Sequence, residues 1–143
     1  MSPNNMPPEK NINLLIQNFI FTFHGHVVKA GLGHAGMTAA DEKREGDGKT
    51  PLGRYPLRQI YYRADRITLP KVMLDEIPIT PDMGWCDDPE HPQYNTLVSL
   101  PFDGGHERLW REDHAYDVII PLGYNDAPPI PDLGSAIFFH ILH

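Results

Sequence analysis

One histidine of this sequence lies in a setting suited to acid–base chemistry. His140 falls within the apolar stretch 136–142 (AIFFHIL), near the end of the chain. If that stretch is a strand, alternation puts Phe138, His140 and Leu142 on one face. An imidazole on an apolar face either hydrogen-bonds to backbone or acts as a base whose pKa its surroundings set near neutrality. The residues alone leave both roles open.

The single cysteine reads as a structural residue. One cysteine allows no intrachain disulfide and no thiolate zinc cluster. Cys86 is followed directly by Asp87 and Asp88. Their negative charges disfavour the thiolate that a nucleophile requires.

Eight histidines raise the question of a metal site. His24 and His26 would share a face of a strand, and His140 and His143 form the second close pair. Neither pair has an acidic or thiolate partner at a suitable spacing. The sequence therefore predicts no metal site and no cofactor, and a histidine-rich metal-binding β domain is the least favoured alternative.

Two glycine-rich strings imitate phosphate-binding loops. Residues 31–36 match G-x-G-x-x-G, but the stretch that follows has no amphipathic helical pattern to receive a pyrophosphate. The GKT at 48–50 lacks the earlier glycine of a P-loop, because Lys43 stands at that position, and Pro51 and Pro56 break the helix that should follow. Neither string predicts a nucleotide site.

Charge and composition exclude several classes of protein. The chain has 12 Lys+Arg against 19 Asp+Glu, a net charge of −7, which argues against nonspecific binding to nucleic acid or to an anionic membrane. The apolar runs are shorter than the ~18 residues of a membrane span. Residues 1–13 lack the layout of a signal peptide, and we expect residues 1–10 to be a flexible lead-in.

The elements that must position these residues are short strands. A length of 143 residues indicates one domain, and 12 glycines with 15 prolines disfavour a helical bundle. We expect one or two helical turns at 107–114 and irregular structure or short strands over 63–93. The fold class predicted is mainly β, a β-sandwich or small barrel with little helix. Strands are predicted within 11–23 (two, with a turn at 17–18), 26–30, 54–62, 94–100, 116–122 and 136–142.

Five strings, in this order along roughly residues 12–143, resemble the YkuD-type L,D-transpeptidase catalytic domain of bacteria, and come closest to its small stand-alone members. Each string is weak alone, but the ordered set is specific. They are KREGDGKTPLG (43–53), GWCDDP (84–89) with YN (94–95), HERLWRED (106–113) with YD (116–117), GYN (123–125) and GSAIFFH (134–140).

The resemblance implies acyl transfer through a cysteine. In that family a thiolate attacks the carbonyl of a peptidoglycan stem peptide, and a second stem's amine takes the acyl group from the thioester. His140 matches the family's base. The resemblance also makes the peptidoglycan stem peptide the partner and implies the periplasm or cell wall. Substrate-groove residues by the same resemblance are Tyr124, Asn125, Gly134 and Ser135.

The sequence departs from the family at the nucleophile. The family's cysteine lies in a Gly-Cys motif well beyond this histidine, whereas the sequence stops three residues after His140, and Cys86 matches a different string. We therefore expect residues 11–143 to be an incomplete catalytic domain that lacks its C-terminal part and gives no transpeptidase turnover alone. The alternative is a noncatalytic peptidoglycan- or partner-binding module on the same scaffold. The oligomeric state is left open.

Overall fold

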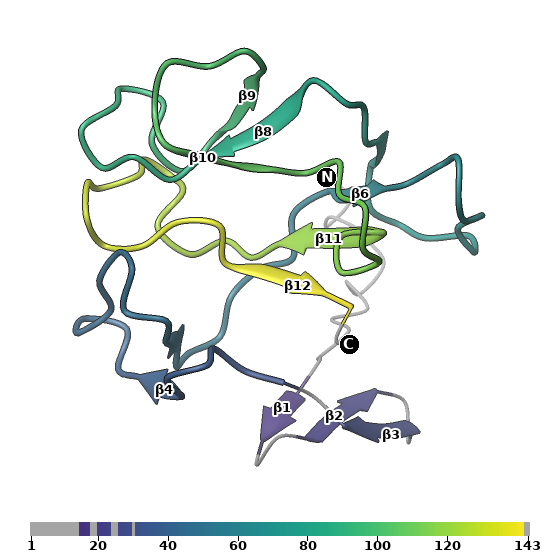
Figure 1. Ribbon diagram of the computed structural model, residues 1–143. Helices are drawn as coiled ribbons and strands as arrows, with labels where there is room; N and C mark the ends of the chain where they lie inside the picture. Colours follow the sequence, from purple (N-terminus) through teal and green to yellow (C-terminus); the bar gives the residue numbers. More distant parts are fainter. Residues whose placement is uncertain (1–14, 18–19, 24–25, 30, 142–143) are drawn as a thin grey trace, which may run out of the picture. The chain divides into compact units, whose positions relative to one another are not determined.

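The computed structural model describes residues 15–17, 20–23, 26–29 and 31–141, and over these the fold is mainly β with no helix (Figure 1). The prediction of a mainly β fold is confirmed. Contacts divide the chain into two compact units, Met1–Gly31 and Leu32–His143. The lead-in expected at 1–10 lies outside the described residues.

The first unit contains a three-stranded antiparallel sheet. Strands β1 (Leu15–Gln17), β2 (Ile20–Phe23) and β3 (His26–Lys29) follow one another in the order β1-β2-β3. Branched and aromatic residues, which favour strands, dominate β2 and β3. The strands predicted within 11–23 and 26–30 are confirmed.

The second unit is built on a four-stranded sheet of order β12-β11-β6-β7. Its strands are β6 (Ile60–Tyr62), β7 (Glu76–Pro78), β11 (Val118–Pro121) and β12 (Phe138–His140). β6 and β7 are parallel, and the other pairs are antiparallel. Ile119 of β11 pairs with Tyr61 on one side and with His140 on the other. Cross-strand partners point to the same face, so His140 stands on the face that carries the buried side chains of Tyr61 and Ile119.

Two smaller sheets complete the second unit. Strands β8 (Met83–Cys86), β9 (Leu97–Ser99) and β10 (His106–Arg108) form an antiparallel sheet of order β10-β8-β9. Strands β4 (Met37–Thr38) and β5 (Thr50–Pro51) form a parallel pair. In the part of the chain that the structure describes, none of these sheets closes into a barrel. The described residues also contain no helix with the length and hydropathy of a membrane span.

Two predicted elements differ in the structure. The helical turns expected at 107–114 are wrong: the stretch begins in β10 and continues as bends and turns. Side chains satisfy its backbone instead of a helical ladder, since Arg66 donates hydrogen bonds to the carbonyls of Glu112 and Asp113. The strand expected at 54–62 is shorter, because only Ile60–Tyr62 is regular and Leu57 makes an isolated bridge to Leu122.

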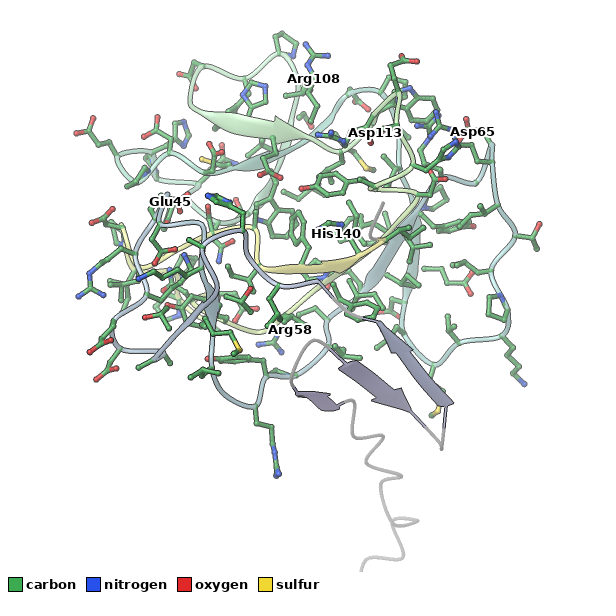
Figure 2. The ribbon with its side chains drawn as sticks, turned by 60° about the horizontal axis from the view of Figure 1, so that its bottom comes forward. Glu45, Arg58, Asp65, Arg108, Asp113 and His140 are labelled. Atoms are coloured by element: carbon green, nitrogen blue, oxygen red, sulfur yellow. The ribbon has the colours of Figure 1, made fainter. Side chains whose placement is uncertain are left out.

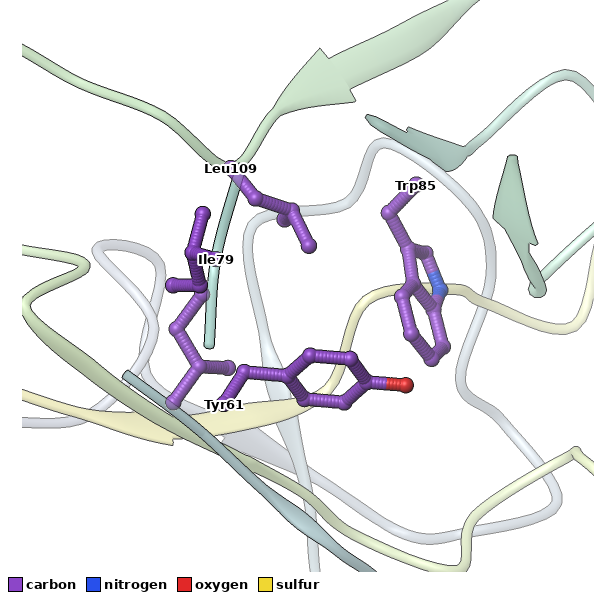
Figure 3. Packing of buried hydrophobic residues seen from close by; sticks show 5 residues of the cluster. Tyr61, Ile79, Trp85 and Leu109 are labelled. Atoms are coloured by element: carbon purple, nitrogen blue, oxygen red, sulfur yellow. The ribbon is translucent and has the colours of Figure 1, made fainter. Parts of the chain in front are cut away.

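The core lies between the four-stranded sheet and the sheet of β8. Its buried cluster is shown in Figure 3, where the rings of Tyr61 and Trp85 lie beside Ile79 and Leu109. Tyr61 and Trp85 meet edge to face, with centroids 6.2 Å apart, and Trp85 meets Phe138 of β12 in the same way at 5.1 Å. These aromatic contacts join β12 to the core.

A buried arginine fixes the loop after β10. The Arg63 guanidinium lies 3.4 Å from the centroid of the Trp110 ring and pairs with both carboxylate oxygens of Asp65. It also donates a hydrogen bond to the carbonyl oxygen of Arg111. Buried charge is thus paired and hydrogen-bonded, as stability requires.

We predict that core truncation at Leu109 destabilises the protein strongly. Leu109 is 1% exposed, so Leu109→Ala leaves a cavity and should lower the free energy of unfolding by about 3 kcal/mol. Met73 is 92% exposed, and Met73→Ala should change the free energy of unfolding by less than about 0.5 kcal/mol. Urea unfolding of both variants checks this, and equal losses would contradict the packing described.

Candidate functional site

His140 stands at the surface end of an aromatic row. Its side chain, labelled in Figure 2, is exposed. Its ring meets Tyr116 edge to face with centroids 5.4 Å apart. The Nδ1 atom lies 2.9 Å from the carbonyl oxygen of Ile141. Because a carbonyl can only accept, Nδ1 carries the proton in the neutral ring and Nε2 keeps its lone pair. The geometry thus gives His140 a basic nitrogen at an exposed position.

Tyr116 packs against the imidazole of His140. Its hydroxyl donates a 2.6 Å hydrogen bond to Glu107 of β10, and its ring also meets Phe138, with centroids 5.9 Å apart. Burial, with the nearby Glu107 carboxylate, raises the pKa of Tyr116, so the phenol stays protonated and holds this bond. Phe138 and His140 therefore share one face of β12, as alternation predicted; Leu142 lies outside the described residues.

The segment leading into β12 is held by the amide of Asn95. This side chain is buried, and its Oδ1 accepts hydrogen bonds from Trp85 Nε1 at 2.9 Å and from the Ala136 N–H at 3.0 Å. Its Nδ2 donates to the carbonyl oxygens of Asn125 at 2.8 Å and Tyr124 at 3.4 Å. One amide thus joins β8, the loop at 124–125 and the start of the strand that carries His140.

The four residues predicted to line the groove belong to the same group of loops. Tyr124 is buried and donates from its hydroxyl to the carbonyl oxygen of Leu133 at 2.6 Å. Asn125 donates from Nδ2 to the carbonyl oxygen of Gly134 at 2.9 Å. Ser135 donates to Glu45 at 2.7 Å. The structure therefore brings these four together, with the polar side-chain atoms of three of them already engaged within the protein.

The charged, glycine-rich string at 43–53 packs against that group. Tyr94 and Ser135 both donate hydrogen bonds to Oε2 of Glu45, at 2.5 and 2.7 Å, and the Tyr94 oxygen accepts one from the Gly134 N–H at 3.0 Å. Gly46 and Gly48 have φ of 74° and 66°, a left-handed conformation that favours glycine. Residues 43–53 therefore form turns that place the Glu45 carboxylate against the segment before β12.

Asn95 and Glu45 were not predicted as site residues. Both fall within strings that carry the resemblance, Tyr94-Asn95 and residues 43–53, but neither has a neighbour in sequence that reveals its partners. For Asn95 the signal available was a polar residue beside an aromatic one, and for Glu45 an acidic residue in a charged run; both are too common to single out a position.

Cys86 lies away from solvent in β8. Its side chain is 0% exposed, and its sulfur lies 4.0 Å from the carbonyl oxygen of Asp88. Burial raises the pKa of the Cys86 thiol, and the charges of Asp88 and Asp87 add to that effect. A backbone hydrogen bond at Asp88 lowers the pKa in part, but the net effect of this environment is a raised thiol pKa that disfavours the thiolate. Among the residues described, no group of three histidine, cysteine or acidic side chains could hold a metal ion.

We predict that the Asn95 amide is needed for the order of β12. Asn95→Ala leaves the Trp85 and Ala136 N–H groups without acceptors and places alanine at φ 56°, so the free energy of unfolding should fall by about 3 kcal/mol. Glycine adopts the positive φ of position 95 without strain, so Asn95→Gly should be about 1 kcal/mol more stable to unfolding than Asn95→Ala.

Hydrogen exchange at Ala136 is the specific readout for Asn95. Exchange there should rise in both variants and stay unchanged in Gln93→Ala, which alters an exposed neighbour. Unchanged protection at Ala136 in Asn95→Ala would refute the assigned role.

We predict that Asp47 stabilises the 43–53 string in a pH-dependent manner. Burial opposes its ionisation, but hydrogen bonds from the Lys43 ammonium and from the N–H groups of Arg44 and Lys49 outweigh this and lower its pKa from 3.8 to about 2. The contribution, about 1–2 kcal/mol, is therefore complete above pH 3.8 and is lost as the pH falls toward 2.

Thermal unfolding at several pH values checks the Asp47 effect. Asp47→Asn should be less stable than the parent at pH 6, and the difference should shrink to a small part near pH 2, where the Asp47 carboxyl is about half protonated. Asp41→Asn, at an exposed position in the same loop, is the control and should track the parent throughout. A difference that is as large at pH 2 as at pH 6 would contradict the linkage.

One family of known proteins matches this chain, and its mainly β fold is consistent with the fold observed. The family model for the L,D-transpeptidase catalytic domain, YkuD, matches residues 17–141. No curated protein and no solved structure is similar enough to this chain to count as a match. The matched span begins at the last residue of β1 in the first unit and ends at Ile141 in the second, so it includes the strings that pack before β12 and His140 itself. The chain belongs to the YkuD family of L,D-transpeptidase catalytic domains.

Proposed function

We propose that this domain binds peptidoglycan stem peptides beside β12, with His140 as the general base of an acyl transfer through a cysteine thioester. Family membership implies an L,D-transpeptidase-like function on peptidoglycan. The observation that carries the proposal for His140 is its exposed ring with Nδ1 hydrogen-bonded to the Ile141 carbonyl, since this leaves Nε2 able to accept a proton.

The proposed chemistry uses the base twice. A thiolate adds to the stem-peptide carbonyl carbon, the carbon–nitrogen bond breaks, and the leaving amine takes its proton from the imidazolium. The amine of a second stem then attacks the thioester, gives a proton to Nε2 of His140 and releases the thiolate. Hydrogen-bond donors must stabilise the oxyanion in both halves.

The groove contacts are proposed to run through backbone. The polar side-chain atoms of Tyr124, Asn125 and Ser135 already make hydrogen bonds within the protein, and Gly134 has no side chain. These residues can still shape the groove, because their hydrogen bonds set the path of the chain into β12. The substrate class would put the site of action in the periplasm or cell wall.

The nucleophile is proposed to be absent from these 143 residues. Cys86 is the one cysteine, and it is buried with a raised thiol pKa. The same observation favours the second candidate function, a noncatalytic module that binds peptidoglycan on this scaffold. The two candidates differ in whether His140 acts on a bound acyl group.

We predict that the protein accelerates hydrolysis of a stem-peptide thioester through His140. A preformed thioester needs no cysteine, so water activated by Nε2 can attack it, and general-base catalysis of this kind is worth about a hundredfold. His140→Gln should remove that acceleration. His34→Gln changes another exposed histidine and should keep it.

Two outcomes would contradict parts of the proposal. Equal rates for the parent and His140→Gln, with peptide still bound, would favour the noncatalytic module. A mass increase by one acyl group after incubation with a stem tetrapeptide, lost in Cys86→Ala, would show that Cys86 is a nucleophile.

A further inference from the structure

A pocket lies beside the first residue of β12, away from the His140 end of the strand. Its volume is about 240 Å³, and its walls come from the four-stranded sheet and from the sheet of β8. Sites for drug-sized molecules span roughly 300–1,000 Å³, so this pocket suits a group the size of one amino acid. The apolar part of its lining is formed by Tyr61, Trp85, Leu97, Leu122, Ile137 and Phe138, and the buried side chain of Asn95 also lines it.

An ion pair stands at the more exposed side of the pocket. Arg58 Nε lies 2.9 Å from Oδ2 of Asp126, and Nη2 lies 3.1 Å from Oδ1. The two side chains are 41% and 25% exposed, whereas Tyr61 and Trp85 are 2% and 7% exposed. The Arg58–Asp126 pair therefore lies at the mouth of the pocket, and the aromatic rings line its deeper part.

The position of Arg58 depends on the backbone of two neighbours. Its N–H donates to the carbonyl oxygen of Pro121, whose strand partner is Phe138. A Cβ on Gly123 would come within 2.9 Å of Arg58 Nη2 and 2.4 Å of Pro56. Only glycine at position 123 leaves room for the Arg58 guanidinium. Figure 2 labels Arg58 near the start of β12.

Both charged groups keep unused hydrogen-bonding capacity. The pair occupies Nε and one N–H of Nη2, which leaves the Nη1 side of Arg58 for a carboxylate. Each oxygen of Asp126 keeps a lone pair that an ammonium group can use. Deeper in the pocket, Gln59 donates to the Tyr61 oxygen at 2.8 Å, so the Tyr61 O–H is left as a donor.

We propose that this pocket binds a free aliphatic α-amino acid. The ligand carboxylate lies on Arg58, its ammonium lies on Asp126, and its side chain lies against Trp85 and Phe138. The mouth carries one positive and one negative charge, so a zwitterion meets a complementary partner at each end. A ligand with a single charge gains one attraction and one repulsion. A residue inside a peptide offers neither charge.

Three ligands of matched shape test the proposal by NMR. Norleucine carries both charges, hexanoate only the carboxylate and pentylamine only the ammonium. The probe is the indole Nε1–H of Trp85, which lines the pocket and donates to Asn95. Norleucine should shift this signal in a saturable manner, and the two singly charged ligands should bind about tenfold more weakly, the loss expected for one charge-assisted hydrogen bond.

Variants of the ion pair complete the test. Arg58→Gln and Asp126→Asn should each weaken norleucine binding by about tenfold. Arg111→Gln is the matched control, because it breaks another exposed two-oxygen pair, with Asp113, outside the pocket, and it should bind as the parent does. Equal affinity for norleucine and hexanoate, no response of Trp85, or unchanged binding in both pocket variants would overturn the proposal.

The outcome is independent of the function proposed for His140. Norleucine binding that survives His140→Gln, together with a failed thioester assay, would reject the acyl transfer and leave the amino-acid site standing. Thioester hydrolysis without any norleucine response would support the acyl transfer and reject the amino-acid site.

Discussion

The hydrogen bonds of the Asn95 amide hold together the segments around β12 in the second unit. They join Trp85 in the core, the carbonyls of the 124–125 loop and the N–H of Ala136 just before β12. A buried amide of this kind is costly unless every donor and acceptor is satisfied, and here each has a partner. Because β12 is three residues long, its position depends on such anchors more than on its own pairing with β11.

That anchoring explains how a short strand presents His140, the base of the proposed reaction. Phe138 reaches into the aromatic core at Trp85, while His140, two residues further, emerges at the surface against Tyr116. The Glu107 carboxylate keeps the Tyr116 hydroxyl in one position. A ring packed on one edge and hydrogen-bonded at Nδ1 loses rotational freedom, and in the proposed reaction this lowers the cost of forming a reactive complex.

Local sequence pattern predicted the strands with strong apolar character, and tertiary contacts decided the rest. The run ending in His140 alternates as expected, because one face of β12 packs on the core. The stretch 107–114 looked helical, yet contacts from Arg63 and Arg66, more than forty residues earlier, hold it in turns. His140 could be singled out from its apolar neighbours. The roles of Asn95 and Glu45 could not, since their partners lie far away in sequence.

The tautomer of His140 is the most direct measure of its fitness as a base. Two-dimensional NMR of nitrogen-15-labelled histidine distinguishes a protonated from an unprotonated ring nitrogen. In the neutral ring, the bond to the Ile141 carbonyl predicts the proton on Nδ1 and none on Nε2. A neutral ring protonated at Nε2 would have no basic nitrogen exposed for substrate, and it would contradict the role assigned to His140.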